Sequence, residues 1–452
     1  MLKGRNSLLL KFLVFISDAA ILFLSASVSA ICLKIWLYGP ILTLSVVYGI
    51  IIFPLMHAMG LYGNTNRKRI DIFLSVILSS LVSILSTLII GKILSPEYFS
   101  NLYILLTGCV NFVIILIWRI LFSKMFIKFV GKETMLVIEA KNVDNKMARK
   151  IKYSCLDMFD SWYTQIDTED FEAFEEFLKT EFTHYQNIFI TNTLPSRYKR
   201  HLMAEAIAAG KEVYLLPELY DINLIKYETV QFDDTPSFHI KHFGPTAGQA
   251  IIKRGFDIVV ASAGLVLLSP LIGLISLGIK ISSPGPIFYI QDRITKGNHI
   301  FKIHKFRTMI KDAEKFSGPI LACETDPRIT PFGKFLRRAR LDELPQLINI
   351  LKGDMSLVGP RPERPFFVEQ FCRTIKNYDK RYVVKPGLTG YAQVYAKYNT
   401  DVSDKLIFDL IYIREYSFWL DIKILLLTLK VIFQKDASSG IKDKQVENKF
   451  AK

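Results

Sequence analysis

Apolar residues are concentrated in the first 130 positions, where they form four long runs. These runs cover residues 8–33, 41–61, 72–90 and 102–122. A helix that crosses a bilayer needs about 20 predominantly apolar residues, and each run is close to that length. The pattern predicts a membrane α-helical bundle of four spans in residues 1–130. The first run is too long, and is followed by too many others, to be a cleavable signal peptide.

Positive charge is uneven between the two ends of this bundle. One end carries Lys3, Arg5, Lys11, Arg67, Lys68, Arg69, Arg119, Lys124, Lys128 and Lys132, and the other carries only Lys34 and Lys92. The positive-inside rule therefore predicts a multi-pass membrane protein with both chain ends of the bundle in the cytoplasm. Asp18 lies inside the first run, and we expect it to face the bundle and pair with a neighbouring helix. A functional charge is the alternative.

Residues 131–245 alternate between short apolar strands and helices. Strands are predicted at 135–138, 187–191 and 212–216, and helices at 170–179 and 200–209. This alternation favours a small parallel sheet of Rossmann type. Residues 139–144 stand where that fold has its glycine-rich phosphate turn, and they contain no glycine. We therefore expect a degenerate Rossmann-like α/β domain without a nucleotide site, with a regulatory or assembly role that includes a possible homodimer surface.

A fifth apolar run covers residues 256–281 and opens a domain that we assign to residues 246–436, before a polar tail at 437–452. Both flanks of this run are positive, with Lys253 and Arg254 before it and Lys280 at its end. Both ends then prefer the cytoplasm, which one straight span cannot satisfy. Ser269 and Pro270 stand at the middle, where proline breaks a helix. A re-entrant helical hairpin is predicted, and a crossing helix with an ordinary kink is the alternative.

The overall charge narrows the class of partner. The net charge is +15, which suits nucleic acid, anionic lipid or phosphorylated substrates. No nucleic-acid motif accompanies it, so we expect membrane lipids and phosphates, and no nucleic acid. The five cysteines are scattered and form no CxxC or Cys/His cluster, which argues against a disulfide framework and against a zinc site.

A pair of adjacent carboxylates, Asp342 and Glu343, lies among arginines in the last domain. Apolar residues recur at helical spacing from Leu341 to Leu351, which predicts that a helix begins at this pair. A helix start favours phosphate and ionised carboxylates. One carboxylate could attack phosphorus while the pair holds Mg²⁺ against a diphosphate. The alternative is that Asp342 only caps the helix and that the arginines are solvated or bind anionic lipid.

Five segments together resemble a known family. They are the Ser269-Pro270 break, KFRTM at 305–309, LDELPQL at 341–347, GDMSLVGPRP at 353–362 and KPGLTG at 385–390. In this order they resemble the catalytic core of bacterial polyprenyl-phosphate glycosyl-1-phosphate transferases, the monotopic phosphoglycosyl transferases that begin capsule, exopolysaccharide and O-antigen assembly. The resemblance covers roughly residues 250–433. Ala339 and Arg340 depart from the family, which more often has a small polar pair such as Thr-Ser there.

The resemblance implies a two-step reaction. Asp342 would attack the β-phosphorus of a UDP-sugar and release UMP, and a polyprenyl (undecaprenyl) phosphate would then take the sugar phosphate from the carboxylate. Glu343 would assist as a metal partner or by positioning and deprotonating the lipid phosphate, and Mg²⁺ would neutralise the diphosphate. The residues implied in phosphate or nucleotide binding are Arg361, Lys305, Arg307, Arg337 and Arg338. Glucose and galactose phosphates are the sugars most usual for the family.

The sequence argues against one rival interpretation and leaves a second one open. A membrane-anchored nucleotide-sugar dehydratase or epimerase needs a dinucleotide fingerprint and a Tyr-x-x-x-Lys pair, and the chain has neither. A polytopic scaffold that recruits other assembly proteins could coexist with catalysis. Near the C-terminus, residues 418–433 are apolar but too short to span, so we expect an interfacial helix with Lys423 and Lys430 reaching to the headgroups, against the alternative of a core helix.

Overall fold

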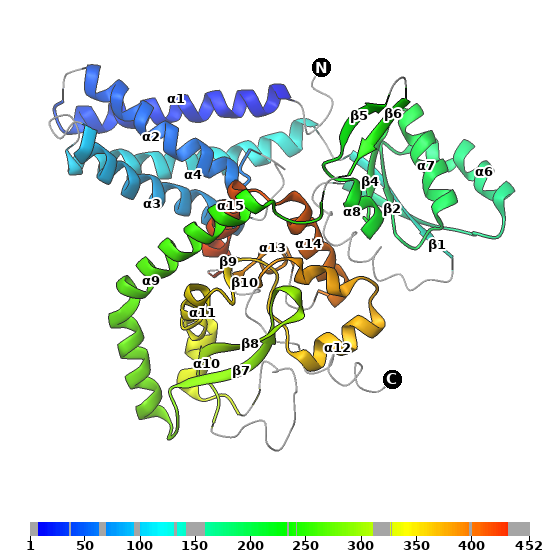
Figure 1. Cartoon of the computed structure of the whole chain (residues 1–452). Helices are drawn as coiled ribbons and strands as arrows, with labels where there is room; N and C mark the ends of the chain where they lie inside the picture. The colour runs from blue at the N-terminus through cyan, green and yellow to red at the C-terminus, as the bar shows by residue number, and fades with distance from the viewer. Residues whose placement is uncertain are drawn as a thin grey trace. The chain divides into compact units, whose positions relative to one another are not determined.

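The structure is a computed structural model, and it divides into two compact units, Met1–Glu218 and Leu219–Lys452 (Figure 1). The residues that it describes are 8–35, 38–62, 69–94, 100–130, 133–141, 159–232, 235–240, 242–310, 326, 328–396 and 400–432. Residues 142–144 of the expected phosphate turn and the tail 437–452 lie outside these ranges. Residues 219–245, which the sequence pattern assigned to the middle domain, fall in the second unit. The domain boundaries drawn on that pattern stay predictions.

The first four apolar runs are helices, as predicted. They are α1 (Leu8–Cys32), α2 (Tyr38–Ala58), α3 (Arg69–Leu94) and α4 (Asn101–Val130). All four are long and apolar enough to cross a membrane, as is a fifth helix in the second unit. Large apolar side chains such as Ile50, Leu85 and Ile93 point outward, while Tyr48 and Tyr103 are buried between helices. This inside-out distribution is what a bundle surrounded by lipid requires.

Asp18 pairs with a neighbouring helix, which confirms the bundle-facing prediction. Its carboxylate forms a buried ion pair with the guanidinium of Arg119 on α4. Arg119 also donates to the carbonyl of Leu61 and lies 4.9 Å over the ring of Tyr62. The prediction that Arg119 belongs to the positive charges at one end of the bundle is therefore wrong. Its charge is neutralised inside the bundle and does not report on membrane orientation.

The middle of the chain forms the predicted parallel sheet, with strand order β2-β1-β3-β4. Its elements are β1 (Glu133–Ala140), β2 (Phe159–Ile166), α6 (Phe171–Lys179), the 3₁₀ helix η1 (Glu181–His184), β3 (Asn187–Ile190), α7 (Ser196–Ala208) and β4 (Glu212–Leu215). Helices α6 and α7 cover one face of the sheet, where Phe174, Tyr198 and Leu202 form the core with Leu136 and Ile138 (Figure 1). The sequence pattern missed β2, because only its two end residues, Phe159 and Ile166, are buried and most residues between them are polar.

The second unit contains a main hydrophobic core, to which most of its helices contribute, and a smaller one around Ile275, Ile279, Phe306 and Leu336. Its strands are β5 (Glu228–Phe232), β6 (Thr235–His239), β7 (Phe288–Ile294), β8 (Ile300–Phe306), β9 (Ser356–Val358) and β10 (Gly387–Thr389). Its helices are α8 (Leu219–Leu224), α9 (Ala247–Ser282), η2 (Lys296–Asn298), α10 (Pro331–Arg338), η3 (Leu341–Glu343), α11 (Gln346–Lys352), α12 (Pro365–Thr374), η4 (Tyr378–Val383), α13 (Tyr391–Tyr395), α14 (Val402–Glu415) and α15 (Phe418–Ile432). The sheets are two-stranded: β7 with β8, β9 with β10, and β5 with β6.

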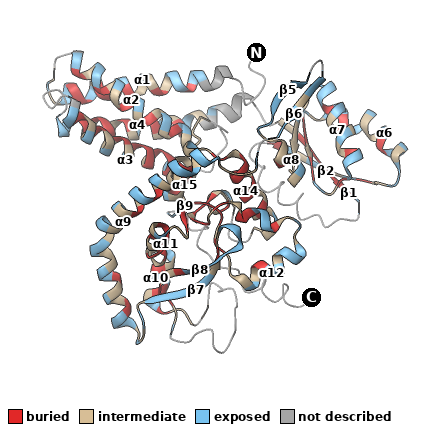
Figure 2. Cartoon of the chain, viewed as in Figure 1, coloured by how far each residue is buried: buried red, intermediate tan, exposed pale blue. Residues whose placement is uncertain are grey.

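The fifth apolar run is one continuous helix, α9, with Pro270 inside it. Its ribbon changes direction part-way along (Figure 1). Only Asp257, Ala261, Ile275 and Ile279 are buried, so most of its apolar surface is exposed (Figure 2). An exposed apolar surface of this extent marks contact with lipid or with another protein. Whether α9 re-enters the membrane or crosses it stays a prediction.

Helix α15 differs from the expected interfacial helix on one of its faces. Ile424 and Leu427 are buried, and Ile424 belongs to the main core. Lys430 is also buried, so it does not extend to the headgroups. Trp419 remains 77% exposed on the other face. The core-helix alternative is therefore correct for the packed face, because its buried positions recur every three residues.

Candidate active site

Asp342 and Glu343 lie in a 3₁₀ turn, η3, and not at the start of an α-helix. Arg340 begins the turn in a left-handed conformation with φ of 58°, and the α-helix α11 starts three residues after the pair, at Gln346. The predicted helix start at the pair is wrong. The apolar spacing misled because it serves two cores: Leu341 and Leu344 pack with Ile275 and Ile279 of α9, whereas Leu347 belongs to the main core.

Two cations hold the Glu343 carboxylate. Its Oε1 lies 3.2 Å from the Lys305 ammonium on β8 and 3.1 Å from a guanidinium nitrogen of Arg361. The side chains of Glu343 and Lys305 are 11% and 18% exposed, whereas Arg361 is 41% exposed. Glu343 and Lys305 therefore form the floor of the site, and Arg361 extends from it towards the solvent.

The pKa values of the two neighbouring carboxyl groups shift in opposite directions. Burial raises the pKa of Asp342, the charge of Glu343 raises it further, and Lys305, Arg337 and Arg340 oppose the rise. Burial also works against ionisation of Glu343, but Lys305, Arg361 and Arg340 together hold the pKa of that carboxyl well below its usual range. Within the described residues, the Asp342 carboxylate accepts no hydrogen bond. One carboxylate is thus fixed and the other is unrestrained.

Burial lowers the pKa of the Lys305 ammonium, and the like charges of Arg361 and Arg293 act in the same direction. Glu343 and, less strongly, Asp342 oppose this and favour the charged form. Lys305 is therefore a cation whose charge depends on the two carboxylates beside it.

The arginines before the pair occupy different places. Arg337 donates from Nε to the Thr308 hydroxyl at 2.8 Å, and its charge acts on Asp342. Arg338 is exposed, on the same helix α10. Arg340 acts on both carboxylates, and the sequence prediction missed it among the binding residues. Its adjacency to the pair was the available signal, together with its departure from the family pattern.

Arg307 has a structural task in this fold. It is buried, and its two terminal nitrogens donate to the carbonyls of Pro284 at 2.9 Å and Ser283 at 2.7 Å. The nitrogen on Ser283 also reaches the hydroxyl of that residue. Gly285 is required beside it, because an added Cβ would lie 2.0 Å from the guanidinium. Arg307 therefore fixes the turn that follows α9, while its predicted phosphate role stays a prediction.

Ser269 and Pro270 lie inside α9, on the membrane-type segment and away from the charged turn in sequence. The Ser269 hydroxyl donates to the Val266 carbonyl at 2.8 Å. This local bond gives the hydroxyl a partner within its own helix, as is usual for serine in an apolar setting. The helix is tied to the site by its C-terminal half, where Ile275 and Ile279 pack under η3.

The acid pair could contribute to a magnesium site but not build one alone. Among the described residues, no group of three or more His, Cys, Asp or Glu side chains is close enough to hold a metal. Glu343 Oε1 is already engaged by two cations, which leaves its other oxygen and the Asp342 carboxylate. Mg²⁺ commonly takes one or two carboxylates and completes its shell with water and substrate phosphates. The donor set therefore fits a magnesium ion that arrives with a diphosphate.

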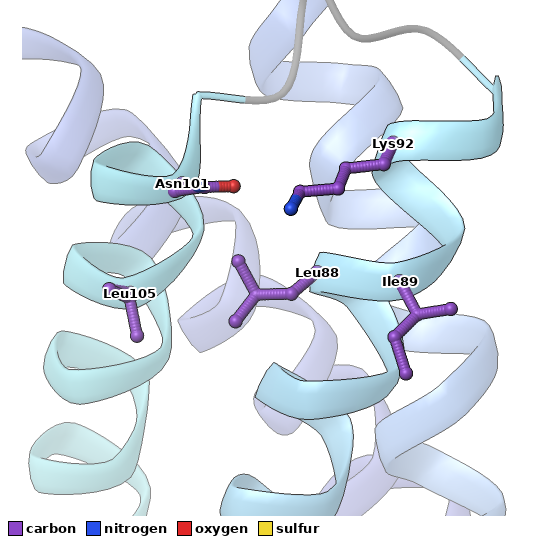
Figure 3. Close-up of a pocket in the computed structure, with 5 residues that line it drawn as sticks. All are labelled: Leu88, Ile89, Lys92, Asn101 and Leu105. Atoms are coloured by element: carbon purple, nitrogen blue, oxygen red, sulfur yellow. The ribbon is translucent and has the colours of Figure 1, made fainter.

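A hollow between the ends of α3 and α4 lies in the other unit and takes no part in this site (Figure 3). It is lined by Leu88, Ile89, Lys92, Asn101 and Leu105. Only Lys92 carries a charge there, and four residues of the five are uncharged. Its composition provides none of the paired carboxylates that phosphate chemistry requires.

The chain is similar in sequence to several known proteins. The family model described as bacterial sugar transferase matches residues 248–435. An Aeromonas hydrophila UDP-N-acetylgalactosamine-undecaprenyl-phosphate N-acetylgalactosaminephosphotransferase is 46% identical over 191 residues, 42% of this chain and 45% of the relative. An Escherichia coli UDP-glucose:undecaprenyl-phosphate glucose-1-phosphate transferase is 40% identical over 222 residues, 48% of each chain. The matched part is about half the length of these two relatives.

A shorter relative is matched over most of its length. A Bacillus subtilis protein provisionally named undecaprenyl-phosphate N-acetylgalactosaminyl 1-phosphate transferase is 50% identical over 136 residues. These residues are 30% of this chain and 75% of the relative. The likeness therefore extends over most of a related protein and is not confined to an isolated motif.

Proposed function

Because the chain belongs to the bacterial sugar transferase family, we propose that it transfers a hexose-1-phosphate from a UDP-sugar to undecaprenyl (polyprenyl) phosphate and releases UMP. Its relatives are named for this type of transfer with N-acetylgalactosamine, glucose and galactose. Another relative is named galactosyl transferase CpsE. The reaction would be the first membrane step of capsule or exopolysaccharide synthesis.

The observation that carries the proposal is the difference between the two adjacent carboxylates. Glu343 is buried and held by Lys305 and Arg361, while Asp342 has no such pairing within the described residues. A carboxylate that is not clamped by cations retains its lone pairs for attack. The cations around the pair are placed to stabilise the charge that develops on transferring phosphate.

Two displacements at phosphorus account for the overall reaction. In the first, an Asp342 oxygen forms a bond to the β-phosphorus, the bond from that phosphorus to the bridging oxygen breaks, and UMP leaves with the electron pair. In the second, an oxygen of the lipid phosphate attacks the same phosphorus, and the acyl phosphate bond to Asp342 breaks. The products are a polyprenyl diphosphate sugar and the free Asp342 carboxylate. No oxidant or reductant is needed.

The contacts of Glu343 favour an orienting role over that of a base. Its lowered pKa makes it a weak proton acceptor, because a base is most effective when its pKa lies near the working pH. It keeps Lys305 and Arg361 in place beside Asp342. Mg²⁺, when bound with the substrate, would neutralise the diphosphate, with Asp342 and Glu343 as its protein ligands.

The proposed membrane placement rests on α9. Its exposed apolar surface and its positively charged flanks support a shallow re-entrant helix, with the active site on the cytoplasmic face of the inner membrane. The site rests on the C-terminal half of this helix. A lipid phosphate at headgroup level would then meet a nucleotide sugar that approaches from the cytoplasm.

The test uses detergent-solubilised full-length protein with polyprenyl phosphate and Mg²⁺. UMP release is measured for UDP-glucose, UDP-galactose and UDP-N-acetylgalactosamine in parallel. We expect release with at least one sugar, and a loss of about 10³-fold or more in Asp342→Asn, since removing a nucleophile abolishes the covalent route. Asp292→Asn is the matched control, because Asp292 is exposed on β7. Near wild-type release by Asp342→Asn would refute the nucleophile assignment, and silence with every sugar would refute the transfer itself.

A further inference from the structure

The loop that carries Arg361 is held in place by hydrogen bonds to its backbone carbonyl oxygens. Four consecutive carbonyls, from Pro360 to Glu363, each accept a hydrogen bond, and the donors come from three parts of the second unit: β10, η4 and the end of β7. Gly387 N–H donates to Pro360 at 2.9 Å, and Ile294 N–H donates to Glu363 at 3.1 Å. The two carbonyls between them are bonded by arginine side chains.

Arg381 holds the first of these inner carbonyls. Its Nη2 donates to the Arg361 carbonyl at 3.0 Å and lies 2.7 Å from the Asp409 carboxylate of α14. Its Nη1 donates to the hydroxyl of Tyr378, and its guanidinium lies 5.1 Å from the centre of that ring. The side chain of Arg381 is only 6% exposed, so it does not reach a substrate from solvent.

Arg293, on β7, holds the second inner carbonyl. Its Nη1 donates to Pro362 at 3.1 Å, and its Nη2 donates to Gln291, also on β7, at 2.7 Å. The Glu363 carboxylate lies 3.9 Å away and balances its charge. The two guanidinium groups thus fix the backbone on the C-terminal side of the Arg361 α-carbon, while the Gly387 bond fixes the carbonyl before it.

We propose that Arg381, with its partner Asp409, and Arg293 are positioning residues for the transfer: they fix the backbone of Arg361 so that its guanidinium meets Glu343 and the substrate phosphate. The inference rests on the proposed function. Arg361 is 41% exposed and has a long side chain, so without a fixed backbone its guanidinium would sample many positions. Bonded carbonyls along the loop remove that freedom before substrate arrives.

Arginine suits this task for a specific physical reason. One planar group can donate to a carbonyl and a carboxylate simultaneously, whereas a lysine ammonium is a compact charge on a flexible stem. Arg381→Lys should therefore keep the buried positive charge opposite Asp409 and lose the fixed bond to Arg361. The substitution separates positioning from charge balance, since Asp409 is not left unpaired.

A double-mutant cycle tests whether Arg381 acts through Arg361. UMP release is measured for the wild type, Arg381→Lys, Arg361→Lys and the double variant. We expect Arg381→Lys to lower kcat/KM about 10- to 100-fold, which is the usual effect of a misplacement of about 1 Å. In the Arg361→Lys background the same change should cost less than about threefold, because the group that it positions is already altered. The loss in kcat/KM should be divided between kcat and KM in the same way in both single variants, because both affect the same guanidinium.

Arg414→Lys is the matched control. Arg414 is another buried arginine of the second unit, and its Nε donates to the Ile225 carbonyl at 2.7 Å, in a different segment from the Arg361 loop. Hydrogen exchange of the peptide that contains residues 359–364 gives a readout independent of activity. It should become faster in Arg381→Lys and stay unchanged in Arg414→Lys.

Two results would overturn the positioning role: additive effects in the cycle, or exchange in residues 359–364 that is equally slow in Arg381→Lys and the wild type. The proposed function fails separately, if the wild type releases no UMP from any UDP-sugar. In that case the hydrogen-exchange comparison alone decides whether Arg381 holds the loop.

Discussion

Lys305 is the residue whose charge most directly affects both carboxylates of the site. Its ammonium lies 3.2 Å from Glu343, and its charge lowers the pKa of both Glu343 and Asp342. Lys305→Met keeps the length and the apolar stem of the side chain and removes only the charge. We expect the pKa of both carboxyl groups to rise. Asp342 matters more for rate, because burial already raises its pKa and it must be ionised to attack.

The size of the change follows from what remains around Asp342. An opposite charge within about 4–6 Å lowers a carboxyl pKa by about 1–3. Arg337 and Arg340 still act on Asp342 after Lys305 is gone, so we expect the low end of that range. The acidic limb of the pH–rate profile should therefore move up by about 1 pH unit. Activity is lost as pH falls through the Asp342 pKa, so at any pH below the limb kcat/KM should fall about tenfold.

The assay is UMP release between about pH 5 and 9, the range over which a carboxyl with a raised pKa can be seen to titrate. Lys305→Arg keeps the charge and should keep the position of the limb. Lys302→Met is the matched control, because Lys302 lies on the same strand with an exposed side chain. Recovery of Lys305→Met at high pH is the decisive feature, since a damaged fold would not recover there.

The refuting result is a Lys305→Met profile whose acidic limb coincides with that of the wild type. It would mean that the charge of Lys305 does not control the ionisation of Asp342. A loss of activity that is constant across pH would refute that control equally, and would assign Lys305 to phosphate binding alone.

Two further predictions concern packing and the membrane bundle. Gly333→Ala should lower the thermal midpoint and the activity, because the added Cβ would lie 2.1 Å from the Thr308 carbonyl oxygen, and overpacking costs about 1–3 kcal/mol. Gly255→Ala is the control and should change neither quantity, because the space around its Cβ is open. Arg119→Met should reduce the yield of folded protein, because it leaves Asp18 buried without its partner at a cost of about 3–5 kcal/mol. Adding Asp18→Leu to the same chain should restore much of that yield, because no unpaired charge then stays buried. Equal yields of the single and double variants would contradict the pairing.

The long apolar helices and the parallel sheet could be predicted from the sequence, because each rests on one local periodicity. Apolar runs of about 20 residues indicated α1 to α4 and the long helix α9. Short apolar strands separated by helices indicated β1, β3 and β4. Strand β2 was missed, because only the end residues of Phe159–Ile166 are buried and most residues between them are polar. A pattern of apolar and polar residues therefore predicts a helix or strand only where that element buries one continuous apolar face or run.

The structure of the turn that carries Asp342 and Glu343 could not be predicted from spacing, because its apolar residues serve two different cores. Leu341 and Leu344 pack on α9, and Leu347 packs in the centre of the unit. When apolar residues at helical spacing pack against two different partners, the chain can form a turn between them as well as one continuous helix. The change of backbone direction at Arg340, with its positive φ, depends on those tertiary contacts and leaves no signature in a window of sequence.

The roles of the arginines depend on burial, which a count of charges near a motif does not reveal. Arg307, Arg293 and Arg381 all lie in or near the charged segments, yet each donates to backbone carbonyls. Arg293 and Arg381 stabilise the loop that carries Arg361, and Arg307 stabilises the turn that follows α9. Arg361 differs because its own carbonyl is held while its guanidinium extends to Glu343 and to solvent. The proposed transfer would use both kinds of arginine: the exposed Arg361 would bind the substrate, and the arginines behind it would keep it at a fixed distance from the carboxylate that attacks.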